Sequence, residues 1–144
     1  MAIWQFEMFI LPEEQVHSGY NDRSEISWEG KSITESSKGK LEDILIRTKS
    51  WSDEIEQYGS SDGTCMEIFH DGNQVMDIHA RLNLRNLTKT ELLGIIDFIK
   101  ENKAAILSDN GEAIPLHLVD IMAEIKKSRA YKFVRNPHGN LTDK

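Results

Sequence analysis

The stretch that decides the fold runs from Val75 to Glu91: Val-Met-Asp-Ile-His-Ala-Arg-Leu-Asn-Leu-Arg-Asn-Leu-Thr-Lys-Thr-Glu. Its first part alternates strictly between an apolar set and a polar set. The apolar set is Met76, Ile78, Ala80, Leu82 and Leu84, and the polar set is Asp77, His79, Arg81, Asn83 and Arg85. Because successive side chains of a strand point to opposite faces, this pattern predicts a half-buried strand. Its polar face is either solvated or available to a partner.

The second part of the same stretch begins a helix. Thr88 and Glu91 have the spacing of a capping box, and Leu87 and Leu92 have that of a hydrophobic staple. Apolar residues then recur at helical spacing up to about Asn102. A helix therefore follows the alternating strand almost directly.

A hairpin precedes that helix. The segments Thr64–Phe69 and Val75–Leu84 both read as strands, and Asp71-Gly72-Asn73 lies between them as a turn. A two-residue loop would bury Glu67, so the side-chain pattern predicts a three-residue loop. With that loop length the outer face of the hairpin carries Cys65, Glu67, Asp77 and His79.

The remaining segments complete an α+β pattern. We predict strands over Ile3–Leu11 and Ala104–Leu107 and a last helix from Pro115 to about Ser128, while residues 13–37 read mainly as loop. This order of elements predicts a single α+β domain over residues 1–144. Its architecture would be an antiparallel β-sheet with two main α-helices packed on one face.

Composition excludes several classes of protein. The 144 residues are 39% hydrophobic and carry a formal net charge of −7. Such a chain can bury a core, but its charge opposes nucleic-acid binding, which depends on Lys and Arg. The same charge favours a basic protein partner. The single cysteine, Cys65, forms no intramolecular disulfide, and we see neither a signal peptide nor a membrane-length apolar run. We therefore expect a cytoplasmic protein without membrane attachment.

Motifs for catalysis or metal binding are missing from the sequence. It contains no paired cysteines, no His-Glu-x-x-His, no nucleophile elbow and no phosphate-binding glycine loop. Cys65 and His79 are the one nucleophile and base that the hairpin would bring together. Because an active dyad also needs an orienting group and an oxyanion site, we favour a plain thiol beside a surface histidine. We predict no enzyme activity, no cofactor and no metal.

Two groups of residues are candidate partner-binding surfaces. In the first, Trp51 would be an aromatic anchor surrounded by the carboxylates of Asp53, Glu54, Glu56 and Asp62. The second is a polar patch on the hairpin, formed by Glu67, Asp77, His79 and Arg81. Structural explanations compete with both: a buried tryptophan beside a capped turn, and mixed charges that solvate the outside of a sheet.

Three segments carry a family resemblance, together with the strand-like start at Ile3. They are Lys49–Ser52, Ile78–Arg85 and Ser128–Pro137. The chain resembles small bacterial immunity proteins encoded beside polymorphic toxins, including those of contact-dependent inhibition systems. The resemblance implies a non-enzymatic cytosolic protein that binds one cognate toxin domain and blocks its active site or substrate surface.

Two other functions fit the same residues. One is an accessory or scaffold domain that binds another subunit through the same sheet face. The other is a small ligand-binding domain, which would require Glu67, Asp77 and His79 to converge in a concavity.

Overall fold

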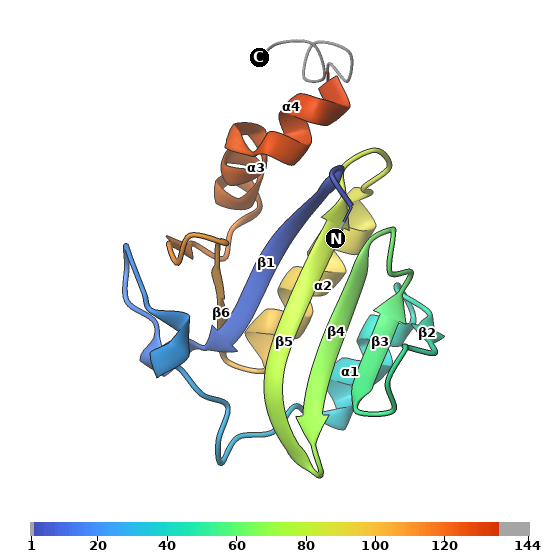
Figure 1. The fold of residues 1–144 in the computed structure, drawn as a ribbon, viewed down its shortest axis with the longest axis vertical. Helices are drawn as coiled ribbons and strands as arrows, with labels where there is room; N and C mark the ends of the chain where they lie inside the picture. The colour runs from blue at the N-terminus through green and yellow to red at the C-terminus, as the bar shows by residue number, and fades with distance from the viewer. Residues whose placement is uncertain (1, 136–144) are drawn as a thin grey trace.

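The computed structural model describes residues 2–135, which form one antiparallel sheet with four α-helices around it (Figure 1). The strands run in the order β2-β3-β4-β5-β1-β6-β7. Their bounds are β1 Gln5–Pro12, β2 Arg47–Thr48, β3 Ile55–Gly59, β4 Cys65–Asp71, β5 Gln74–Asn83, β6 Ala104–Leu107 and β7 Ala113–Ile114. The helices are α1 Glu35–Glu42, α2 Lys89–Glu101, α3 Leu118–Lys127 and α4 Arg129–Arg135. The predicted α+β fold is confirmed. Asn136 and Pro137, which end one of the resembling segments, lie outside the described residues.

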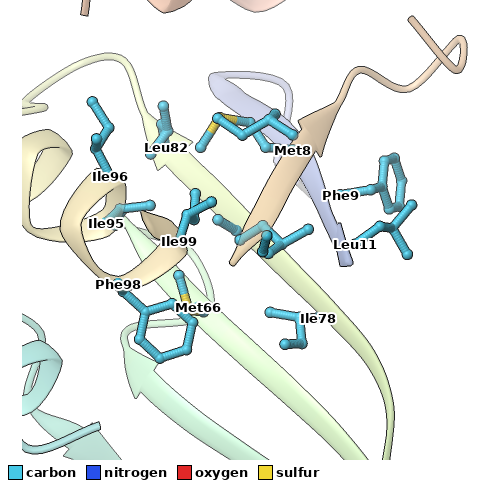
Figure 2. Packing of buried hydrophobic residues seen from close by; sticks show 14 of the residues in the cluster. Met8, Phe9, Leu11, Met66, Ile78, Leu82, Ile95, Ile96, Phe98 and Ile99 are labelled. Atoms are coloured by element: carbon cyan, nitrogen blue, oxygen red, sulfur yellow. The ribbon is translucent and has the colours of Figure 1, made fainter. Parts of the chain in front are cut away.

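Helices α1 and α2 lie behind the sheet in Figure 1, and the front face of β1, β5, β4 and β3 carries no helix. Helix α2 begins as expected: Thr88 Oγ1 accepts a hydrogen bond from Glu91 N–H, and the Glu91 carboxylate accepts one from Thr88 N–H. Its apolar side meets the strands in one core, where Figure 2 shows Ile95 and Ile99 facing Met66 and Leu82. We refer below to the uncovered side as the open face.

The two helices that share this layer are not the pair expected from the sequence. The predicted C-terminal helix lies at one end of the sheet, where α3 contacts β7 and α4 contacts β1. It also begins later, at Leu118, and breaks at Ser128, where the backbone turns extended and the Ser128 hydroxyl accepts a hydrogen bond from Tyr131 N–H. The second helix of this layer, beside α2, is instead α1. It begins inside the segment predicted mainly as loop and ends beyond it.

The β4–β5 loop differs from the three-residue prediction. Asp71 pairs with Gln74, so the loop has two residues, and Gly72 supplies the positive φ of 62° that the turn requires. The extra residue appears instead as a bulge in β5, where Met76 has no partner between two paired neighbours and is 55% exposed. Beyond the bulge, Glu67 and His79 lie on the same face of the hairpin, as predicted: they pair with each other on the open face.

One buried tryptophan fastens the long connection between β1 and α1. Trp28 is 2% exposed, and its Nε1 donates a hydrogen bond of 3.1 Å to the carbonyl of Ile10 in β1. Two hydrogen bonds between Gln15 and Ser27 close the loop around it. A segment with little secondary structure is thereby fixed against the core.

None of the helices within residues 2–135 combines the length and the apolar content that crossing a bilayer requires.

Candidate functional site

The loop that joins β2 to β3, residues 49–54, presents Trp51 to solvent. Trp51 is 84% exposed, and the neighbouring Asp53 and Glu54 are exposed as well. The loop is a turn, in which Ser52 O accepts a hydrogen bond of 3.2 Å from Ile55 N–H. The structure therefore rules out a buried tryptophan beside a capped turn. We call residues 49–54 the Trp51 loop.

Glu56, predicted to belong with this loop, lies on the helix side of the sheet. Its carboxylate accepts a hydrogen bond of 2.9 Å from Lys38 Nζ of α1 and one of 3.1 Å from Tyr58 OH. His70 Nε2 lies 2.5 Å from the same carboxylate. Burial raises the pKa of Glu56, but the hydrogen bond and charge of Lys38, with the bonds from Tyr58 and His70, outweigh it and hold the pKa below its usual value. Glu56 thus ties α1 to the sheet on the side that the helices cover.

This arrangement predicts a pH-dependent loss of stability on removing Glu56. Glu56→Ala should lower the free energy of unfolding by about 1–3 kcal/mol at pH 7, because Lys38 loses a charged hydrogen-bond partner in a half-buried position. Since the folded pKa is lowered, this stabilisation is present above the unfolded pKa and disappears as the pH falls through the folded one. Urea unfolding at pH 7 and at pH 3 measures the difference.

Glu35 provides the matched control for that experiment. Its carboxylate lies 3.8 Å from the same Lys38 Nζ but is 90% exposed. Glu35→Ala should change the free energy of unfolding by only about 0.5 kcal/mol or less. Equal losses for the two variants would contradict a structural role for Glu56.

Asp62 lies apart from the other acidic residues. It is in the β3–β4 turn, at the opposite end of β3 from Asp53 and Glu54. Trp4 Nε1 donates a hydrogen bond to its backbone carbonyl, and Ser60 Oγ donates one of 2.5 Å to its carboxylate. The Ser60 hydrogen bond lowers the pKa of Asp62. The four carboxylates expected around Trp51 are therefore split among three places, and only Asp53 and Glu54 stay beside it.

The second predicted group does come together, on the open face. The Glu67 carboxylate pairs with the Arg81 guanidinium, and the Glu67 side chain is only 7% exposed. His79 lies between two carboxylates, with Nδ1 3.5 Å from Glu7 and Nε2 3.1 Å from Asp77, although neither its Nε2 nor Arg81 Nε has a hydrogen-bond partner among the described residues. The patch is therefore a tightly packed polar layer and not the solvated stripe that alternation alone would give.

Two phenylalanines hold the imidazole of His79 in place. The ring of Phe9 meets it edge-on, with 4.8 Å between ring centroids, and the ring of Phe69 lies at 5.3 Å. Arg23 covers the Phe9 ring, with its guanidinium carbon 3.5 Å from the ring centroid. Glu7, Phe9 and Phe69 complete this layer. The sequence places Glu7 on the polar face of the first strand, but it does not connect these three residues with His79, because their contact depends on which strands pair.

Cys65 is not paired with His79. It lies opposite Arg81 in the β4–β5 register and is fully buried. Burial raises the pKa of the Cys65 thiol, against the opposing effect of Arg81. A protonated, inaccessible thiol is a poor nucleophile, which leaves the plain structural interpretation of Cys65.

Two clefts lie beside the open face. One, of about 720 Å³, lies where the start of β1, the β6–β7 turn and the α3–α4 junction meet, and Glu7 lines it. The other, of about 610 Å³, is lined by Arg23 and Asp77. Neither cleft is lined by Glu67 or His79, so the three residues required by a ligand-binding domain do not share either of them. The described residues also contain no group of three or more His, Cys, Asp or Glu side chains that could hold a metal ion.

An exposed isoleucine, missed in the sequence, lies at the end of β2 opposite to the Trp51 loop. Ile46 directly precedes β2 and is 74% exposed. Within the run Ile44-Leu45-Ile46 the sequence does not reveal which residue faces solvent, since all three are equally apolar.

Comparison of the chain with protein-family models, curated proteins and solved structures gave no match.

Proposed function

We propose that this chain is an immunity protein that binds and neutralises a basic cognate toxin, with the Trp51 loop as the anchor of the interface. The observation that carries the proposal is the 84% exposure of Trp51 beside two exposed carboxylates. Tryptophan is the residue type most enriched among interface hot spots, and an exposed aromatic ring on a short loop gains most by entering a partner's pocket.

Charge supports the same partner class. The chain carries a net charge of −7, and Asp53 and Glu54, which follow the anchor, are exposed and form no ion pair within residues 2–135. Complementary charge accelerates encounter between an acidic inhibitor and a basic toxin, whereas the buried contact of the anchor sets the dissociation rate.

The direct test is co-purification with the product of the gene immediately upstream. Recovery of one stoichiometric basic protein whose toxicity this chain suppresses would support the proposal. Recovery of a stoichiometric partner that is not toxic would instead indicate an accessory or scaffold domain.

Two variants separate the anchor from the charges. Trp51→Ala should weaken the complex about 30-fold, mainly through faster dissociation, because it removes a hot-spot side chain. Reversal of charge in Asp53→Lys/Glu54→Lys should slow association about tenfold at low salt and much less at high salt. Biolayer interferometry against the toxin measures both rates.

Matched controls exist on other parts of the surface. Tyr20 is 73% exposed beside the opposite edge of the sheet, and Tyr20→Ala should leave both rates unchanged. Glu13→Lys/Asp97→Lys changes the net charge equally at two other exposed positions. If this control pair slowed association as much as the loop pair, the effect would come from net charge and the Trp51 loop would not be the docking site.

A further inference from the structure

The two edge strands of the sheet differ in whether other segments of the chain hydrogen-bond to them. At the β7 edge the chain covers itself: Ala113 N–H donates a hydrogen bond of 3.0 Å to Gly19 O, and Asn21 N–H donates one of 2.7 Å to Gly111 O. At the other edge lies β2, and no further strand of residues 2–135 pairs with it (Figure 1). One edge is therefore closed by the loop around Tyr20, and the other is open.

Hydrogen-bond alternation shows which groups of β2 are unpaired. Gly59 N–H donates to Ile46 O at 2.8 Å, and the pairing continues with Arg47 opposite Tyr58 and Thr48 opposite Gln57. In an antiparallel pair, alternate residues direct their backbone groups toward the neighbouring strand. Since Ile46 and Thr48 face β3, the N–H and C=O of Arg47 point away from the sheet.

Exposed apolar side chains stand on both sides of these free backbone groups. Ile46 precedes β2 and is 74% exposed, and Trp51 follows it and is 84% exposed. An open edge is a template for pairing with another chain, and folded proteins usually protect it. Here it adjoins the Trp51 loop, so the open edge and the proposed anchor form one continuous surface.

The charge of Arg47 indicates which kind of chain can pair with β2: a second copy of this protein or a different protein. Two copies related by a twofold axis would pair their β2 strands antiparallel, which places Arg47 opposite Arg47 or Lys49 of the other copy. Like charges directly opposite each other destabilise a strand pair. The edge therefore suits a different chain, one with an acidic side chain opposite Arg47. Arg47 is exposed, although its guanidinium lies over the Tyr58 ring and donates a hydrogen bond of 2.8 Å to Thr48 O.

We propose that the protein partner adds an extended segment to β2, hydrogen-bonded to the backbone of Arg47, with an acidic residue facing Arg47 and an apolar residue against Ile46. This inference rests on the proposed function and specifies how the partner is held: strand addition supplies backbone hydrogen bonds, and Ile46 and Trp51 supply the side-chain contacts.

Amide hydrogen exchange, measured by NMR on the full chain with and without the upstream-encoded toxin domain, tests the backbone contact. Arg47 N–H should exchange rapidly in the free protein and about 100-fold more slowly in the complex, whereas Thr48 N–H, already bonded to β3, should be protected in both. If Trp51 signals shift on binding while Arg47 N–H keeps exchanging rapidly, strand addition is overturned and the proposed function stands. If nothing binds, both fail.

A pair of substitutions at one position gives the second readout. Arg47→Pro removes the outward N–H and should weaken the complex about tenfold, the size of one lost hydrogen bond, with little change in Tm. Arg47→Ala keeps the N–H and should weaken it no more than about threefold. Equal effects of the two variants would assign the contact to the side chain and overturn strand addition, as would Arg47 protection in a dimer of this chain alone.

Discussion

Replacing Trp28 by alanine is expected to cost about 3–5 kcal/mol of folding free energy, the usual range for deleting a large buried aromatic side chain. Trp28 is 2% exposed, and its indole Nε1 also donates a hydrogen bond to Ile10 O in β1. Its loss would leave a cavity and release the connection between β1 and α1. With a typical domain stability of about 5–15 kcal/mol, the variant should melt roughly 10 °C lower or more.

Two tryptophan substitutions calibrate that measurement. Trp28→Phe keeps most of the ring and loses the indole N–H, so it should cost about 1–2 kcal/mol. Trp51→Ala removes an equally large but exposed side chain and should change stability by about 0.5 kcal/mol or less. Calorimetry or urea unfolding of the three variants should give this order, and a Trp28→Ala protein as stable as Trp51→Ala would contradict the assigned burial.

The second large effect is expected at the buried ion pair of the open face. Glu67→Ala should destabilise the fold by about 3 kcal/mol, because it leaves the Arg81 guanidinium largely buried without its counter-charge. The Glu67 side chain is 7% exposed and that of Arg81 15%, so water compensates only part of the loss. Urea unfolding at pH 7 measures the change.

A double variant distinguishes the cost of an unpaired buried charge from the net contribution of the ion pair to the free energy of unfolding. Glu67→Leu/Arg81→Met removes both charges and keeps similar volumes, so its stability should lie within about 1 kcal/mol of the parent protein or above it. Glu67→Ala should then be much the less stable of the two. If both variants lost the same amount, packing and not the unpaired charge would be responsible.

Some features could be predicted because their causes are local in the sequence. The capping box of Thr88 and Glu91 depends on a spacing of three residues, and the faces of β5 depend on a period of two. Helix α1 was not predicted because Leu41 is its single apolar residue, so it has no apolar stripe. It is held in place by α2: the Asn102 side chain accepts a hydrogen bond from Thr34 N–H and donates one to Ser37 Oγ.

For the candidate surfaces, the sequence determined which side chains could take part, and the tertiary structure decided which are free to do so. Trp51, Asp53 and Glu54 were identified as a possible interface from their types alone, whereas Glu56 proved to be engaged beneath α1. Glu67 was expected on an outer face and is there, yet its pairing with Arg81 buries it.

Sequence alone therefore established the α+β class, the alternation of β5, the start of α2 and the acidic character of the chain. The tertiary structure alone decided that β2 is an edge strand without a further partner strand within residues 2–135, and that the exposed Ile46 and Trp51 flank it. It also decided that the loop around Tyr20 closes the opposite edge. The physical reason is range: strand and helix patterns arise between residues a few positions apart, whereas exposure and edge position depend on which distant segments pack together.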